Sequence, residues 1–504
     1  MKLKILILMS LTYCLTSSSF FLAEHLDDLI RNGLASEEQI AFAASKNVAS
    51  AKLVLRKKHI IGSDNWLSLT QDLAVDDSLY ALELGQYYYN VQTDELAFLW
   101  LQRAVEQGEQ NAVFPLAKLW FQRQAYQQVL ALSSSSPQDI ELLLLAVEAA
   151  IAQGDIAFVS RHITRLNHEE SAQELLTLIT RYKILDTVFN DDRVLGAAQP
   201  LLPSAMSATV TPSVCHNSIQ LFATNIHDLD YLQTLVERFS THPLRSAFCF
   251  SPIRYVPLAQ LKCQHDDKAA IQCDESIWQR KVTEINTRYL GVLVPKGGAN
   301  VHFGIMYLDN NDTVNVIAHE LSHLLGFVDE YPLSEHHTTC QQHQQAMFAP
   351  NVAIIKEIYY GDKTLVRAQV LKQIPWAKFI KSSTPILTPA DKGANNSWQL
   401  GTPLKHKDEF GIFAAETCDG RKVQAFKPLL KPTQLTYFEL DFPAQYQKII
   451  ADDLNAYSMP SFHYNVALSL FGQGRVTEAK GWLNVSAEFE KNKLRQMKVL
   501  QGAF

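Results

Sequence analysis

Apolar residues near the start of the chain follow a helical spacing that repeats. One set recurs after 32 positions, with a small residue where two helices must approach closely: Leu84-Gly85 with Tyr88, then Leu116-Ala117 with Trp120. Ala97 to Leu101 lies between them, and its spacing returns near the C-terminus at Ala479 to Leu483, after the turn-like Gly472 to Arg475. Both ends are therefore expected to form helical hairpins, which either bind a protein partner or serve as a packing scaffold.

The distribution of proline divides the chain into three parts. Residues 24–200 hold only Pro115, Pro137 and Pro200, whereas residues 201–460 hold the other sixteen prolines and the tail holds none. Proline interrupts helix interiors, so the sequence predicts a helical front, a loop-rich middle and a helical end. The Pro-rich stretch of small residues from Gly196 to Ser213 is the expected linker.

In the middle part, the pattern predicts two strands and then a helix. The strands are Tyr289 to Val294 and His302 to Leu308, and a hairpin is the simplest way to join them. Asn311, Asp312 or Thr313 can then cap a helix whose apolar positions recur at helical spacing: Val314, Ile317, Leu321, Leu324 and Leu325. Gly326 is a natural end for that helix.

The expected helix carries the chemistry of the chain. His319 and His323 are four residues apart, so both face the same way and can hold one zinc ion, while Glu320 between them can reach a zinc-bound water. Zinc lowers the pKa of that water toward ~7, and Glu320 can take its proton and later return one to a leaving amine. This spacing predicts zinc as cofactor and Glu320 as the catalytic residue.

A third metal ligand should follow the helix, because Gly326 can take a left-handed conformation that turns the chain back toward the site. Asp329 is the best-placed candidate and Glu330 its close competitor. Weaker candidates lie on the next loop: His336, His337 and His343. The pattern from His319 to Asp329 resembles metzincin peptidases, which place a histidine or, less often, an aspartate at the third position.

The segments that follow resemble the IgA-peptidase-type family of bacterial zinc metallopeptidases. The resemblance is carried by Asp329 to Pro332 and, in the order of that family, by Ala349 to Val352, Ile374 to Ile380, Thr384 to Pro389, Gly411 to Phe413 and Phe426 to Pro428. It implies a metzincin-like fold over roughly residues 289–445. A methionine turn is also expected below the zinc; the corresponding stretch offers only Leu435, which leaves Met347 or Met459 as substitutes.

Composition and targeting signals place this chemistry outside the cytoplasm. Lys2 and Lys4 before the apolar run from Ile5 to Leu15 resemble a secretory signal, and no later segment is apolar enough to span a membrane. Six cysteines lie between residues 215 and 418, an even number that suits disulfides, with Cys263 and Cys273 as the one obvious local pair. The net charge of −7 gives no reason to expect nucleic acid as a partner.

Together these patterns predict an exported α+β protein in five segments: a signal peptide (1–23), a helical-repeat domain (24–195), a linker (196–213), a metzincin-like zinc metallopeptidase domain (214–445) and a C-terminal helical hairpin (446–504). The expected activity is hydrolysis of peptide bonds in protein or peptide substrates. Tyr331 or Tyr437 could stabilise the oxyanion, and an extended substrate could pair with the strand His302 to Leu308. The alternative is a non-catalytic envelope binding or assembly protein that keeps the zinc site for structure.

Overall fold

The computed structural model describes residues 21–186, 215–264, 269–281, 285–334, 337–390, 396–453 and 455–502. The described chain forms two compact units, one made of Met1–Ala150 and His162–Ser171 and the other of Ile151–Arg161 and Ala172–Phe504. The expected α+β class with a helical N-terminal region is confirmed. Most of the expected signal peptide and all of the expected linker lie outside the described residues.

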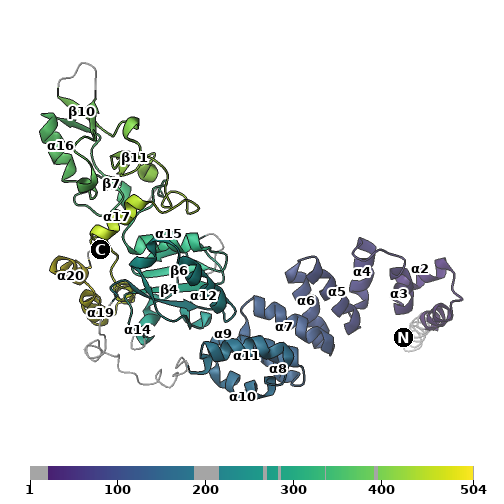
Figure 1. The fold of residues 1–504 in the computed structure, drawn as a ribbon. Helices are drawn as coiled ribbons and strands as arrows, with labels where there is room; N and C mark the ends of the chain where they lie inside the picture. The colour runs from purple at the N-terminus through teal and green to yellow at the C-terminus, as the bar shows by residue number, and fades with distance from the viewer. Residues whose placement is uncertain are drawn as a thin grey trace, which may run out of the picture. The chain divides into compact units, whose positions relative to one another are not determined.

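The N-terminal region consists of helices joined by short turns (Figure 1). Their bounds are α2 Glu37–Ser45, α3 Ala49–Arg56, α4 Asp64–Leu73, α5 Ser78–Asn90, α6 Asp94–Glu106, α7 Val113–Gln122, α8 Tyr126–Ser135, α9 Ile140–Gln153, α10 Ile156–Leu166 and α11 Gln173–Arg181. The aromatic positions of the sequence repeat, Tyr88 and Trp120, lie in the last turns of α5 and α7. Gln92 after α5 and Gln124 after α7 both have positive φ, and the next residue donates to the carbonyl of Tyr88 or Trp120, the repeated aromatic positions.

The second unit is built around a mixed sheet with strand order β2-β1-β4-β6-β5. The strands are β1 Ser218–Ala223, β2 Cys249–Phe250, β3 Arg254–Tyr255, β4 Tyr289–Val294, β5 Asn300–His302 and β6 Ile305–Asp309; β3 pairs with β1 beyond the end of β2. All pairings are parallel except that of β5 with β6.

The predicted hairpin between residues 289–294 and 302–308 is wrong, because β4 and β6 run parallel. The real hairpin is β5 with β6, turned at Phe303 and Gly304, both of which have positive φ. The chain therefore returns along β5 before it inserts β6 next to β4. As a result β6 lies inside the sheet, and β5 forms the edge on this side.

Helices cover both faces of this sheet, and the alternation of side chains along the strands decides which face each residue serves. Helices α12 (Asp228–Phe239) and α15 (Val314–Leu324) lie on one face, where Tyr289 reaches the end of α15. The other face carries α14 (Trp278–Lys281) and the hairpin of α18 (Phe462–Gly472) and α19 (Val476–Glu488), as Figure 1 shows.

The C-terminal hairpin has the expected turn, with Gly474 at φ +76°, but it does not stand apart as a domain. Its buried residues form one core with sheet residues Leu290, Val292 and Tyr307. The buried Arg288 connects it to the sheet, because its guanidinium donates to Glu490 Oε1 at 2.5 Å and to the carbonyls of Phe489 and Met459. Helices α17 (Ala444–Asp452) and α20 (Lys493–Leu500) flank this region.

Residues 337–427 add a lobe of short elements beyond α15. It contains α16 (Lys363–Leu371) and two three-stranded antiparallel sheets, one of β8 Ile358–Tyr360, β9 Leu387–Pro389 and β10 Ser397–Leu400, the other of β7 Ala353–Ile354, β11 Phe413–Ala415 and β12 Ala425–Lys427. The disulfide Cys340–Cys418 lies in the small core of the second sheet.

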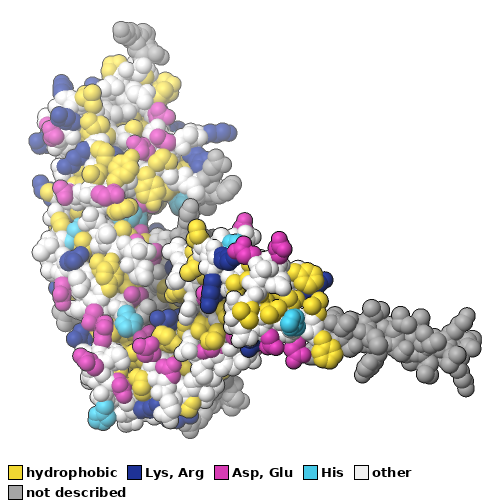
Figure 2. All heavy atoms as spheres, turned by 90° about the vertical axis from the view of Figure 1, so that its right-hand side faces the viewer, with side chains coloured by type: hydrophobic (Ala, Val, Ile, Leu, Met, Phe, Trp, Pro, Cys, Tyr) yellow, Lys and Arg dark blue, Asp and Glu magenta, His cyan; other side chains and the backbone are white. Residues whose placement is uncertain are grey.

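All six cysteines between 215 and 418 form disulfides: Cys215–Cys249, the expected Cys263–Cys273, and Cys340–Cys418. Such bonds persist in oxidising compartments, which fits a protein outside the cytoplasm. Among the described residues, no helix has the length and apolar character needed to cross a bilayer. On the face drawn in Figure 2, acidic and basic side chains are interspersed, and neither sign forms a broad patch.

Candidate metal centre

Helix α15 fixes the two histidines by local geometry. It begins after Thr313, and its apolar residues Ile317, Leu321 and Leu324 are buried. The preceding turn is held by Asp312, whose carboxylate accepts the backbone N–H of Asp309 at 2.7 Å. His319 and His323 therefore emerge one turn apart on the opposite side of the helix, as the sequence predicted.

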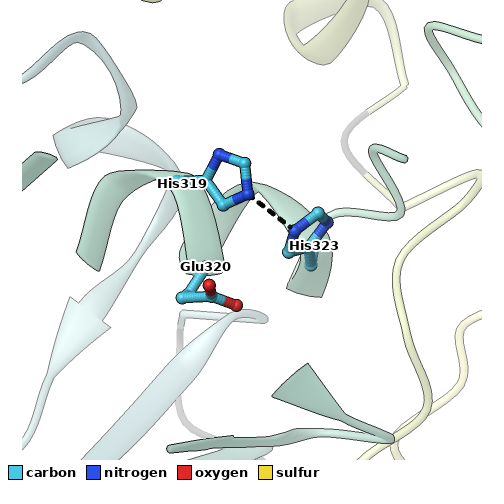
Figure 3. A group of neighbouring side chains, drawn as sticks. All are labelled: His319, Glu320 and His323. Atoms are coloured by element: carbon cyan, nitrogen blue, oxygen red, sulfur yellow. Dashed lines mark hydrogen bonds between the residues drawn. The ribbon is translucent and has the colours of Figure 1, made fainter. Parts of the chain in front are cut away.

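The two imidazoles are oriented for a shared cation. His319 Nδ1 lies 2.9 Å from the carbonyl oxygen of Gln434, and His323 Nδ1 lies 2.8 Å from that of Phe327. Each Nδ1 can donate to its carbonyl, which leaves the Nε2 atom as the electron-pair donor. The two Nε2 atoms face each other at 3.1 Å, and Glu320 lies below them on the same helix (Figure 3).

Asp329 completes a triangle with the two histidines. Its Oδ1 atom lies 3.1 Å from His319 Nε2 and 3.3 Å from His323 Nε2. The edges of a tetrahedron around zinc with bonds of about 2.0–2.1 Å are about 3.3 Å long, so the three atoms have the separation that zinc requires. Oδ1 is buried and receives no well-formed hydrogen bond from any described residue, which also fits a metal ligand.

Charges around this triangle compensate one another. Burial lowers the pKa of His323, but the adjacent Asp329 carboxylate outweighs this effect and raises it to about 10. Burial raises the pKa of Asp329, but the two imidazoles hold it well below its usual range. The three side chains together thus favour a positive charge between them.

Glu320 lies next to the two histidines on the same helix. His319, Glu320 and His323 offer ligand atoms that all lie within 4.8 Å of one another. The Asp329 oxygen is closer to both imidazoles than that limit, so Asp329 and Glu320 are both candidates for the third position beside the two histidines, and Asp329 lies nearer. Glu320 is buried, and this burial raises its pKa.

Glu330, the competing candidate ligand, points away into a closed polar network. Its carboxylate is fully buried, forms an ion pair with Lys427 at 2.9 Å and accepts hydrogen bonds from Asn351, Thr433, Thr436 and Tyr446. All of its acceptor capacity is used by the protein. Glu330 is therefore a structural anchor beside Asp329 and not a metal ligand.

The loop that carries Asp329 is held on both sides. Asn351 exchanges two hydrogen bonds with the backbone of Val328, and the Glu330 N–H donates to the carbonyl of Leu435 at 2.9 Å. Thr417 Oγ1 donates to the Asp329 carbonyl at 2.9 Å. Asn351 and Lys427 belong to segments that carried the family resemblance. In the structure both side chains help to fix this loop.

The floor below His319 is a turn that the sequence analysis did not assign. Thr436 N donates to Thr433 O, and the turn brings the Gln434 carbonyl to His319 and buries Leu435 completely. Met347 is 43% exposed and contacts Tyr457, so it does not form the floor. Met459 binds the end of α15 through its backbone. The signal in the sequence was the position of Leu435 after the Phe426 to Pro428 segment.

The remaining histidine and tyrosine candidates lie in different surroundings. His337 caps a short 3-10 helix, His343 is exposed, and His336 lies outside the described residues. Tyr331 lies against the Asp329 carboxylate, and burial together with this contact raises its pKa. Tyr437 is 56% exposed on the chain after the floor turn.

No protein-family model matches the chain, and neither the curated proteins nor the solved structures contain a significant match. The metzincin-like and IgA-peptidase-type resemblance therefore remains an expectation from the motif. The proposed function therefore rests on the geometry of His319, Glu320, His323 and Asp329.

Proposed function

We propose that this chain is a zinc-dependent peptidase that hydrolyses protein or peptide substrates outside the cytoplasm. The observation that supports it best is the triangle of His319 Nε2, His323 Nε2 and Asp329 Oδ1, with sides of 3.1, 3.1 and 3.3 Å, next to the buried Glu320. The resemblance of the same segment to metzincin and IgA-peptidase-type enzymes agrees with it. The three disulfides support an oxidising location.

When zinc is bound by these three side chains, it supplies a Lewis acid that acidifies water and polarises a carbonyl group. Glu320 takes the proton from the attacking water and gives a proton to the leaving amine. Tyr331, which is 39% exposed next to Asp329, offers a phenol O–H to the developing oxyanion. These roles need no residue outside the loop and helix described above.

Substrate alignment is expected along β5. This strand forms the edge of the main sheet and contacts α15. An extended peptide that pairs with it would be positioned by main-chain hydrogen bonds, with little demand on its side chains. The expected edge strand His302 to Leu308 is wrong, because β6 is paired on both sides, and the edge is formed by Asn300–His302 instead.

The test is metal content by elemental analysis together with hydrolysis of a mixed peptide library. We compare the wild-type chain with Glu320→Gln, which keeps the shape of the side chain, and with Glu357→Gln, an exposed glutamate in the same unit. About one zinc per chain in all three, with cleavage lost only in Glu320→Gln, supports the peptidase. Zinc without cleavage by any of them favours the binding or assembly role, and no zinc in the wild type removes the proposal.

A further inference from the structure

The third ligand of the candidate metal centre is connected to a disulfide through one side chain. Thr417 is 1% exposed, and its hydroxyl donates to the backbone carbonyl of Asp329 at 2.9 Å. Thr417 directly precedes Cys418, which is bonded to Cys340. Its own carbonyl accepts the N–H of Leu333 at 3.0 Å and lies 3.4 Å from Cys340 Sγ. Thr417 thus connects the disulfide to the loop that carries Asp329.

The surroundings of this disulfide offer little other support. Val328 and Leu333, on either side of Asp329, pack against a small core around the disulfide. This core consists of the two cysteines with Val352, Ile354, Ala415, Val423 and Ala425. Strands of two or three residues form the sheet above. So few apolar groups stabilise a fold weakly, and a cross-link between residues 78 positions apart restricts the unfolded chain strongly.

The two histidines have no comparable dependence. They sit on α15, whose hydrogen bonds are internal and whose apolar side is buried against the main sheet. Asp329 follows the end of that helix and has its place set by contacts from far along the chain. Loss of the disulfide should therefore displace one ligand and leave the other two in position.

We propose that Thr417 is a positioning residue for Asp329 and that the Cys340–Cys418 disulfide holds Thr417, so that high metal affinity arises only when this disulfide is formed. The inference rests on the proposed metal site, but not on peptidase activity. Reduction by a dithiol transfers two electrons and two protons to the disulfide, giving two thiols while the reductant forms its own cyclic disulfide. In a reducing compartment the chain therefore lacks a complete metal site.

The experiment measures zinc affinity of the full chain by competition with a chromophoric chelator, and ligand geometry by the visible spectrum of bound Co²⁺. Thr417→Val replaces the hydroxyl by a methyl group of similar size, and Thr417→Ser keeps the hydroxyl and removes the methyl group. Cys340→Ser with Cys418→Ser removes the disulfide. Its matched control is Cys263→Ser with Cys273→Ser, because that disulfide belongs to the core on the other face of the main sheet.

We expect Thr417→Val and the Cys340/Cys418 variant to bind zinc about 10- to 100-fold more weakly than the wild type, the range for residues that orient metal ligands. The Co²⁺ spectrum should change in both, whereas Thr417→Ser and the Cys263/Cys273 control should match the wild type. Far-UV circular dichroism checks that each chain is folded. If the Cys340/Cys418 variant does not fold, Thr417→Val with its serine rescue decides the question.

Wild-type affinity and spectrum in Thr417→Val would overturn the inference, as would equal weakening by the control disulfide. A wild-type chain that binds no zinc would also overturn it, together with the metal site. A chain that binds zinc tightly but cleaves no peptide would count against the peptidase proposal alone, because the affinities of the variants still decide the role of Thr417.

Discussion

The helix α15 and the loop Phe327 to Tyr331 contribute to the same site in different ways. The helix presents His319 and His323 through its own hydrogen bonds and one buried side. The loop has no regular structure, and its proposed ligand Asp329 is held by contacts from Asn351, Thr417 and the turn around Leu435. A ligand pair on one helix is set by local sequence, whereas a ligand on a loop depends on the whole second unit.

The largest effect expected is the loss of metal when either region loses its ligand. His323→Ala in the helix and Asp329→Ala in the loop should each lower zinc affinity by more than about 100-fold, beyond the range of residues that only orient ligands. Elemental analysis after dialysis measures this. His343→Ala, an exposed histidine of the neighbouring loop, is the control and should keep its zinc. Zinc retained by Asp329→Ala would show that another side chain is the third ligand.

The second-largest effect is expected from loss of the Glu330 carboxylate, which should lower the stability of the loop that carries Asp329. Glu330→Gln leaves the Lys427 ammonium buried without its carboxylate partner, which costs about 3–5 kcal/mol. Denaturant unfolding of the metal-free chain measures the loss. Adding Lys427→Met removes the unpaired charge and should recover part of it. Unchanged stability in Glu330→Gln would mean that the ion pair does not hold the loop.

The junction between the two regions is Gly326, at φ +87°. A Cβ atom there would lie 2.1 Å from the carbonyl oxygen of Tyr457, so Gly326→Ala combines a left-handed backbone with a clash and should cost about 3 kcal/mol. Gly420→Ala has a similar φ of +75° but open space, and should cost about 1 kcal/mol. Equal losses in thermal or denaturant unfolding would show that the Tyr457 segment yields to the new methyl group.

The smallest effect concerns the C-terminal hairpin, which packs on the face of the sheet opposite α15. His463 is buried against Phe489 and Trp482, and burial lowers its pKa to about 3. Its ordinary pKa is about 6.5, so the unfolded chain takes up a proton first, and stability present above pH 6.5 is lost as the pH falls toward 3. The loss at pH 5 is about 2 kcal/mol.

His463→Phe keeps an aromatic ring and removes this proton uptake, so its stability should fall less between pH 7 and 5 than that of the wild type. Some dependence should remain, because burial and the nearby Arg288 also lower the pKa of His216 to about 3. Unfolding curves at both pH values provide the comparison. Parallel losses in the variant and the wild type would show that His463 is not the group that titrates.

Several features of the site and the fold were accessible from particular residues. The spacing of His319 and His323, the helix stop at Gly326 and the position of Asp329 all have the geometry expected from sequence. The turn at Gly472 to Arg475 and the Cys263–Cys273 pair were also found. The hairpin of residues 289–308 failed, because a period of two residues identifies strands but does not set their direction or order. The suggestion that Met347 lies below the site was also wrong, because the neighbouring sequence does not determine whether a residue is buried.

The sequence alone determined the elements whose hydrogen bonds are internal: the helical hairpins and α15 with its two histidines and Glu320. Only the tertiary structure decided between Asp329 and Glu330, which are adjacent acids with the same local signal. One is turned to the imidazoles and the other to Lys427 because residues 351, 417, 427 and 433–436 close around the loop. Contacts between positions about a hundred residues apart leave no periodic trace in the sequence, so the third ligand could be proposed but not chosen.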